Sequence, residues 1–501
     1  MHRRLLSFLI LTCLGNVLVE PGLAQVDLLQ LASRGETQTV LSSLEFQSSV
    51  DAMQADGTSL LHWAVYYDDA ALVLRLLSLG ADPALANDYG ATPLSQAAVT
   101  GNPGIIRALL EAGADPDERS ADDQTALMIL ARTDNLDAAQ VLLDAGADVN
   151  AAESFRGQTA LMWAAAQKRP QMLKLLLDHG ADPNARSTPN NWPRQVSAEP
   201  RMKFLPSGGL TPLLYAAREG CTECVSYLLD AGADIHADDP EGITPLIMAC
   251  LNAHWDSARL LVTAGAIINE WDIYGRSPLY ATVDYNTVPH GGRPDKLSDD
   301  LTSNLEFMQM LLEGGANPNL QLKIFPPYRD LGADRVSRGD RFLLVAGATS
   351  LLRAARGADL EAIELLLRFH ALIDLPNENA TTPLMVAAGY GVGDADTRGR
   401  FRTEADALPA TRLLLEHGAS VNHQDNTGST ALHGAAQLGW SQMVSLLLEF
   451  GADASIEDAT GSTPLDYALG RGGRYREGGG GPVFLETAVI LESTLTLMSN
   501  P

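Results

Sequence analysis

The segment DHGADPN (178–184) decides the fold, because the chain repeats it. Close copies are DAGADVN (144–150), EAGADPD (111–117), DAGADIH (230–236), EGGANPN (313–319) and EHGASVN (416–422). Aligned on the glycine before the Ala-Asp pair, the series is Gly80, Gly113, Gly146, Gly180, Gly232, Gly265, Gly315, Gly418 and Gly451, with His370 in the one gap. The first spacings are 33, 33 and 34 residues, and the longer ones of 52, 50, 55 and 48 hold one period plus an insertion. Such a period is the signature of a repeat architecture.

A second phrase follows the same period. It reads GATPLSQAA (90–98), GQTALMWAA (157–165), GLTPLLYAA (209–217), GITPLIMAC (242–250), ATTPLMVAA (380–388) and GSTALHGAA (428–436). Its Thr can cap a helix whose first residue is Pro, where the missing N–H costs nothing. An apolar run such as MLKLLLDHG (172–180) then predicts a second helix, which ends at a glycine in the left-handed conformation.

This pattern resembles the ankyrin repeat over residues 57–495, through the Gly-x-Thr-Pro-Leu phrase, the Ala-Ala pair, the Leu run and Gly-Ala-Asp-x-Asn. The resemblance implies an all-α solenoid of stacked antiparallel helix pairs with projecting hairpin loops. We count about eleven repeats, opening near residues 57, 90, 123, 157, 209, 242, 275, 347, 380, 428 and 461.

The predicted domains follow from this count. Residues 25–56 are an N-terminal helical cap. Repeats 1–4 occupy 57–208 with an insertion at 186–203, and repeats 5–7 occupy 209–346 with insertions at 287–303 and 320–343. Repeats 8–11 occupy 347–495 with an insertion at 391–406 and a Gly-rich loop at 470–483.

The first 24 residues have the features of a signal peptide. Arg3 and Arg4 precede the apolar run LLSFLILTCLGNVLV (5–19), and Gly22-Leu23-Ala24 supplies small residues for cleavage after Ala24. The alternative is a retained membrane anchor, but this run is shorter than the roughly 20 residues that span a bilayer. We therefore expect an exported protein, periplasmic or extracellular, without stable membrane insertion.

The charge of the chain restricts its partners. The formal net charge of −27 repels nucleic acid and anionic lipid. The four insertions and the Gly-rich loop nevertheless hold 17 of the 35 Lys and Arg residues. The expected partner is a protein, with either a basic surface or an acidic patch that faces these loops.

Two insertions carry candidate contact residues, because long loops on a rigid scaffold commonly carry function. These residues are Trp192, Arg194 and Arg201 in the first insertion, and Tyr328, Arg329, Arg335 and Arg338 in the third. The alternative is that the loops fold back onto the acidic body, or that they have no function.

Aromatic residues of the repeats are a second set of candidates. Trp63, Trp163 and Tyr215 occupy one register position before the small-residue pair, where they either offer a concave binding groove or only pack. Tyr66 and Tyr67 follow the pair in repeat 1, and Trp271 and Tyr274 lie in the loop before repeat 7.

No residue pattern predicts catalysis, a metal or a cofactor. Cys221 and Cys224 form the single CxxC motif, without zinc spacing or a thioredoxin-like context, so we expect structural cysteines. A local disulfide of Cys224 with Cys221 or Cys250 is the alternative. His62 and His433 stand where the resemblance implies a structural histidine in the turn.

Three functions are compatible with these features. We favour an exported, non-catalytic protein-binding scaffold that uses its inserted loops, its concave helix face, or both. The alternatives are an accessory or protective subunit of an exported redox enzyme, and a secreted effector that binds host proteins.

Overall fold

The computed structural model describes residues 27–44, 50–189, 208–287, 299–324, 346–391, 403–473 and 480–499. Throughout these ranges the regular structure is helical, apart from isolated β-bridges such as Pro189 with Gly208. None of the helices in the described part of the chain combines the length and the apolar character needed to cross a membrane. The predicted all-α fold is confirmed.

The chain divides into two compact units, residues 1–126 with 137–147 and residues 127–136 with 148–501. In unit 1, α1, α3 and α5 form one row and α2, α4 and α6 form a second row that packs against the first. The bounds in unit 1 are α1 Leu28–Ser33, α2 Thr37–Ser43, α3 Leu60–Tyr66, α4 Ala70–Ser78, α5 Pro93–Thr100 and α6 Pro103–Glu111. The unit boundary runs through the next helix pair. In α7 (Ala126–Thr133), every residue after the first belongs to unit 2. In α8 (Leu136–Asp144), every residue after the first belongs to unit 1.

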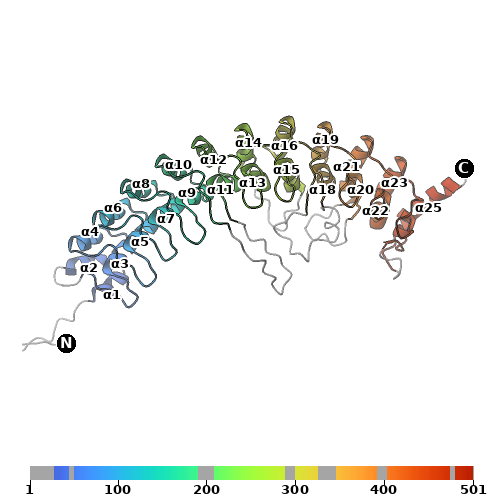
Figure 1. Cartoon of the computed structure of the whole chain (residues 1–501). Helices are drawn as coiled ribbons and strands as arrows, with labels where there is room; N and C mark the ends of the chain where they lie inside the picture. The colour runs from blue at the N-terminus through green and yellow to red at the C-terminus, as the bar shows by residue number, and fades with distance from the viewer. Residues whose placement is uncertain are drawn as a thin grey trace, which may run out of the picture. The chain divides into compact units, whose positions relative to one another are not determined.

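Unit 2 repeats the same arrangement over a longer stretch (Figure 1). Its first row is α9 Ala160–Ala166, α11 Pro212–Glu219, α13 Pro245–Leu251, α15 Pro278–Thr287, α18 Ser350–Gly357, α20 Pro383–Ala387, α22 Ala431–Leu438 and α24 Pro464–Ala468. Its second row is α10 Pro170–Asp178, α12 Thr222–Asp230, α14 Trp255–Thr263, α16 Asn304–Glu313, α19 Leu360–Arg368, α21 Glu404–Glu416, α23 Ser441–Glu449 and α25 Leu485–Ser499. Each helix contacts its pair partner and the next helix of its own row.

The first-row helices begin as the sequence predicts. In α5, the Thr92 hydroxyl accepts a hydrogen bond from the Ser95 N–H at 3.1 Å, and Pro93 is the first helical residue. The same Thr-Pro start occurs at Thr211, Thr244, Thr382 and Thr463. Each cap satisfies a backbone donor that the short helix leaves unpaired.

Small and apolar residues make the core between the two rows. Ala97 and Ala98 of α5 are fully buried, as are Leu173 and Leu176 of α10. Because a pair of alanines has almost no side-chain volume, neighbouring helices of the first row pack closely. No single repeat encloses a core of its own, so each repeat depends on its neighbours for burial.

The asparagine that closes the repeated phrase joins consecutive repeats. The Asn184 side chain donates to the Gly232 carbonyl at 3.1 Å and accepts from the Asp234 N–H at 2.7 Å. The same double contact is made by Asn150, Asn269, Asn319 and Asn422. The phrase therefore recurs because it forms both the end of one repeat and its attachment to the next.

The insertions lie at two kinds of place. The first (186–203) follows α10 and the third (320–343) follows α16, so both connect one helix pair to the next. The second (287–303) begins at the last residue of α15 and ends before α16, and the fourth (391–406) follows α20 and ends within the first turn of α21, so both lie within a pair.

Candidate functional site

Three aromatic side chains at the end of α3 form the aromatic cluster, consisting of Trp63, Tyr66 and Tyr67. The ring centroid of Trp63 lies 5.7 Å from that of Tyr66 and 6.2 Å from that of Tyr67, and the two tyrosine centroids are 5.0 Å apart. Tyr66 is 56% exposed and Tyr67 39% exposed. The structure thus brings these three predicted site residues together on an accessible surface of unit 1.

The aromatic cluster is attached to the protein by one hydrogen bond and by the partial burial of Trp63. The Tyr67 hydroxyl donates to the Ser33 carbonyl in the N-terminal helix α1 at 2.9 Å. Trp63 is half-buried, and its indole Nε1 is buried without a hydrogen-bond partner within the described residues. The rings are therefore held in place before any partner binds.

Trp163 and Tyr215, which share the register position of Trp63, lie in unit 2 and differ in exposure. Tyr215 is only 6% exposed, and its hydroxyl accepts a hydrogen bond from Gln158 Nε2 at 2.7 Å. Trp163 is half-buried, like Trp63. Burial and this hydrogen bond favour a packing role for Tyr215 over a role in binding.

Two arginines that contact the Trp163 and Tyr215 rings were not among the predicted site residues. The Arg132 guanidinium lies 5.0 Å from the Trp163 ring centroid, and that of Arg218 lies 4.9 Å from the Tyr215 ring centroid. Both arginines directly follow the small-residue pair, which is the register position of Tyr66 in repeat 1. That shared register is the signal that would have identified them.

The two predicted aromatic residues in the loop before α15 differ in their exposure. Trp271 is 49% exposed, and the Lys323 ammonium lies 4.7 Å from its ring centroid. Tyr274 is 7% exposed, and burial raises the pKa of its hydroxyl to about 12. Trp271 is therefore available for contact, whereas Tyr274 belongs mainly to the loop framework.

The Tyr274 loop is held by a buried ion pair. Arg276 Nε and Asp272 Oδ2 are 2.6 Å apart, with side-chain exposures of 9% and 0%. The other oxygen of Asp272 accepts from the N–H groups of Tyr274 and Arg276 at 3.0 and 2.9 Å. One carboxylate therefore sets both the turn and the position of the guanidinium.

The described ends of the first and third insertions are joined to the repeats. Pro189 pairs with Gly208, and Arg186 Nη1 donates to the Asp238 carbonyl at 2.5 Å. Gln321 pairs with Thr349 at the base of the third insertion. The predicted contact residues Trp192, Arg194, Arg201, Tyr328, Arg329, Arg335 and Arg338 lie outside the described residues.

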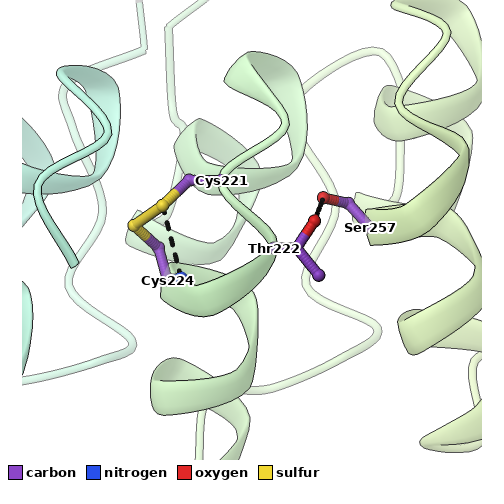
Figure 2. Close-up of a disulfide and its surroundings, with 4 residues drawn as sticks. All are labelled: Cys221, Thr222, Cys224 and Ser257. Atoms are coloured by element: carbon purple, nitrogen blue, oxygen red, sulfur yellow. Dashed lines mark hydrogen bonds between the residues drawn. A yellow bond between two sulfur atoms is a disulfide. The ribbon is translucent and has the colours of Figure 1, made fainter. Parts of the chain in front are cut away.

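The cysteines differ from the expectation. Cys221 and Cys224 form a disulfide at the start of α12 (Figure 2), and Cys250 is free and buried. We expected structural cysteines and left a local disulfide as the alternative, and this alternative is the one that forms. Cys221 is the N-cap residue and Cys224 lies one turn later, with 5.1 Å between their Cα atoms, which is within the range that a disulfide spans.

The disulfide takes the place of an ordinary helix cap. The second-row helices α4, α6 and α19 have the N-cap residues Asp69, Asn102 and Asp359, whose side-chain oxygens accept a backbone N–H of the first turn. In α12, Cys221 Sγ accepts from the Cys224 N–H at 3.3 Å. Figure 2 shows Thr222 on the other side of the turn, directed toward Ser257 of α14, with their hydroxyls 3.0 Å apart.

None of the three cysteines among the described residues offers a reactive thiol. Cys221 is 6% exposed and Cys224 is fully buried. Burial raises the pKa of the Cys250 thiol to about 12, so this cysteine stays protonated at neutral pH. Because the thiolate is the nucleophilic form, the geometry does not favour thiol catalysis at this place.

The two structural histidines close helix N-termini. His433 Nδ1 accepts from the Thr430 N–H at 3.1 Å, and its Nε2 is 3.2 Å from the Ser462 carbonyl of the next repeat. His62 makes the same contacts with Ser59 and with the Ala91 carbonyl. Burial lowers the pKa of both imidazoles, so both rings are neutral at neutral pH.

Comparison with curated proteins finds short matches. Ankyrin repeat domain-containing protein 63 of Homo sapiens is 36% identical over 103 residues, which is 20% of this chain and 24% of the relative. The protein of the same name from Mus musculus gives the same figures. The match thus spans about a quarter of the length of these curated relatives.

Comparison with solved structures and family models gives longer matches. The ankyrin repeat domain of Bcl-3, described as a unique member of the IkappaB protein family, is 26% identical; the match covers 45% of this chain and 94% of that domain, with a TM-score of 0.38. A family model described as ankyrin repeats (3 copies) matches residues 28–120, 105–187, 213–322 and 403–476. These matches cover more than half of the chain, and the protein belongs to the ankyrin repeat family.

Proposed function

We propose that this protein is an exported, non-catalytic scaffold that binds a protein partner. Ankyrin repeats are protein–protein interaction modules, and the stacked helix pairs occupy most of the described residues. The single observation that carries the proposal is the aromatic cluster, which is large, exposed and fixed in place on such a scaffold. Aromatic side chains of this kind supply much of the energy of protein interfaces.

Export is part of the proposal and has two supports. The apolar run at 5–19 follows Arg3 and Arg4, and Gly22-Leu23-Ala24 provides a cleavage site. The Cys221–Cys224 disulfide fits an oxidising compartment, because disulfides rarely persist in a reducing cytosol. Cell fractionation of the source organism, with detection of the processed chain in the exported fraction, tests this part.

The redox-enzyme alternative needs an accessible thiol or a bound cofactor. The CxxC cysteines are joined and nearly inaccessible, and the thiol of Cys250 is buried. Thiol titration of the folded chain separates the alternatives: no rapidly reacting thiol agrees with the scaffold, whereas a fast-reacting thiol favours the redox role. The effector alternative differs from the scaffold only in that its partner belongs to a host.

Affinity capture from the exported fraction tests partner binding. One bait is the full chain, and a second lacks 190–207 and 325–345, each replaced by a short Gly-Ser linker. These deletions keep the Pro189–Gly208 and Gln321–Thr349 bridges, so the repeats on either side stay joined. A protein retained by the first bait and lost by the second assigns binding to the loops, and equal retention assigns it to the repeats.

Capture results also decide whether the scaffold function stands. Failure of both baits to retain any protein, from every fraction in which the chain is found, would overturn it. Turnover of a substrate that a single side-chain replacement abolishes would overturn the non-catalytic part.

A further inference from the structure

We propose that the aromatic cluster of Trp63, Tyr66 and Tyr67 binds a basic segment of the protein partner, in which Arg or Lys alternates with apolar residues. This proposal rests on the scaffold function proposed above and specifies the chemistry of the partner.

The rings offer π faces in a fixed arrangement. Tyr66 stands edge-on to both neighbours, at interplanar angles of 83° to Trp63 and 90° to Tyr67. Tyr66 is also the most exposed of the three. A guanidinium or ammonium group over a Trp or Tyr face is attracted by the ring quadrupole, by about 0.5–1 kcal/mol at an exposed site. Because the rings already pack on one another, little conformational entropy is lost when a cation binds.

Two carboxylates lie directly after the rings. Asp68 is exposed, and its Oδ1 accepts from Asn102 Nδ2 at 2.8 Å, which holds the side chain in place. Asp69 accepts from the Leu72 N–H at 3.0 Å and from Gln38 Nε2 at 3.3 Å. The fold thus positions two negative charges immediately after the aromatic cluster in the chain, which favours a cationic partner there.

The charge of unit 1 favours the same partner. Its described residues include sixteen Asp and Glu side chains and only four Lys and Arg, namely Arg34, Arg75, Arg107 and Arg119. This balance repels acidic segments, nucleic acid and anionic lipid, and it attracts a basic polypeptide. Charge complementarity thus selects one class of occupant.

The surface beside the cluster predicts the apolar part of the segment. Val99 occupies in the next repeat the register position of Tyr66, and it is 66% exposed. Its helix α5 packs directly against α3. A segment that crosses from repeat 1 to repeat 2 meets aromatic faces first and an aliphatic side chain next, which fits alternating basic and apolar residues.

The indole N–H of Trp63 lacks a hydrogen-bond acceptor in the described part of the chain, which a bound partner would provide. Trp63 Nε1 is buried and has no acceptor among the described residues. A buried donor without an acceptor costs about 1–3 kcal/mol, and few such groups occur in native proteins. A carbonyl of the bound segment that reaches this N–H would supply the acceptor.

Peptide binding to the full chain tests the proposal. The probe is a fluorescein-labelled octapeptide of alternating Arg and Leu, and the charge-reversed control has Glu in place of Arg. The variants are Tyr66→Ser and Tyr66→Phe. Tyr89→Ser is the matched control, because Tyr89 is a 70% exposed tyrosine of the same unit outside the cluster.

The expected result follows from the ring chemistry. Fluorescence anisotropy should show binding of the Arg-Leu peptide and not of the Glu-Leu peptide. Tyr66→Ser should weaken the affinity for the Arg-Leu peptide about fivefold. Tyr66→Phe, which keeps the ring, and Tyr89→Ser should each leave this affinity within about twofold of that of the unchanged chain. Far-ultraviolet circular dichroism verifies that each variant is folded, and Tyr66 is exposed enough to be replaced without loss of core packing.

Three outcomes would overturn the proposal. Equal affinities of Tyr66→Ser and Tyr89→Ser for the Arg-Leu peptide would show that only the general negative charge attracts it. Failure of the chain to distinguish the Arg and Glu peptides would exclude a site for cations. A captured partner that Tyr66→Ser still retains would leave the scaffold function standing and remove the cluster from it.

Discussion

The side-chain oxygen of Asn184 accepts a hydrogen bond from the backbone N–H of Asp234, 50 residues further along the chain, at 2.7 Å. The nitrogen of the same amide donates to the Gly232 carbonyl at 3.1 Å. One side chain thus satisfies two backbone groups that follow the end of α12. Because an insertion separates α10 from α11, this contact joins two repeats that are far apart in the sequence.

We predict that Asn184→Ala lowers the free energy of unfolding by about 1–2 kcal/mol, since two hydrogen bonds to backbone groups are lost. Asn184→Asp should cost less, because the acceptor remains. Asp374 shows this reduced form of the contact, where it accepts from the Ser420 N–H at 3.0 Å. Urea denaturation followed by circular dichroism measures the difference, and equal midpoints for Asn184→Ala and the unchanged chain would contradict it.

The sequence predicts the framework of this fold well, because the framework follows from local chemistry. Thr92 and Pro93 begin a helix as expected, and the glycines of the repeated phrase, such as Gly180 with φ +86°, adopt the left-handed conformation. Both features depend only on neighbours in the chain. Their repetition at one period then predicts the stacking of helix pairs.

The candidate site was less predictable, because exposure depends on neighbours in space. Tyr66 and Tyr215 each lie beside the small-residue pair of their own repeat, yet Tyr66 is 56% exposed and Tyr215 only 6%. Their difference arises from what packs beside them, such as Gln158 against the Tyr215 hydroxyl. The disulfide was similarly ambiguous, because the CxxC spacing alone does not distinguish a helix cap from two free thiols.

The disulfide should stabilise α12 modestly. Its loop is short, and the chain-entropy relation for so few residues gives about 2 kcal/mol or less. We therefore predict that dithiothreitol, at a concentration that reduces the bond, lowers the unfolding midpoint by a few degrees without unfolding the chain at 25 °C. Differential scanning calorimetry with and without the reductant measures the shift.

The capping role gives this prediction a matched pair of variants. The double variant Cys221→Asn/Cys224→Ala restores an oxygen acceptor at the N-cap, as at Asn102 in α6. Cys221→Ala/Cys224→Ala provides none and should be less stable by about 1 kcal/mol. Identical stabilities of the two variants would show that the cysteine position is not a cap.

Two glycines with positive φ should respond differently to the same replacement. Gly180 has φ +86°, and a Cβ there would meet no atom within 4 Å. Gly275 has φ +85°, and its Cβ would lie 2.6 Å from the Lys323 backbone nitrogen. Gly180→Ala should therefore cost about 1–2 kcal/mol from backbone strain alone, whereas Gly275→Ala should cost more.

The comparison of these two variants is internally controlled, because both add one methyl group at nearly the same φ. Thermal unfolding midpoints give the order directly. His370 occupies the Gly180 position in another repeat at φ +65°, which shows that the fold accepts a side chain there. A larger loss for Gly180→Ala than for Gly275→Ala would contradict the prediction.

The buried pair of Arg276 and Asp272 should be sensitive to loss of one partner. Asp272→Ala leaves a guanidinium that is 9% exposed without its carboxylate and removes the acceptor of two backbone N–H groups. Removal of one member of a buried ion pair costs about 3–5 kcal/mol. The exposed pair of Lys174 and Asp178 is the control, and Asp178→Ala should cost about 0.5 kcal/mol or less. Equal losses in urea denaturation would show that the Asp272 contacts are not stabilising.

His433 should make the stability of the chain depend on pH. Burial lowers the pKa of its imidazole below the ordinary value of 6.5, and the Nδ1 atom already accepts the Thr430 N–H. The unfolded chain therefore binds a proton more readily than the folded chain. The stabilising contribution is complete above pH 6.5 and is lost as the pH falls from 6.5 toward the lower pKa of the folded state. Protonation would place a second donor against the Thr430 N–H and break the cap.

We predict that the unfolding midpoint of the chain falls between pH 7.5 and pH 5, and that His433→Gln falls less over the same interval. The nearby carboxylates Asp425 and Asp458 act in the opposite direction, because their charge favours the imidazolium. They are present in both proteins, so the difference between the two curves isolates His433. His417→Gln is the matched control, because it makes the same replacement at an exposed histidine that does not contact His433 or Thr430. Parallel curves for the original chain and His433→Gln would show that this imidazole does not couple protonation to folding.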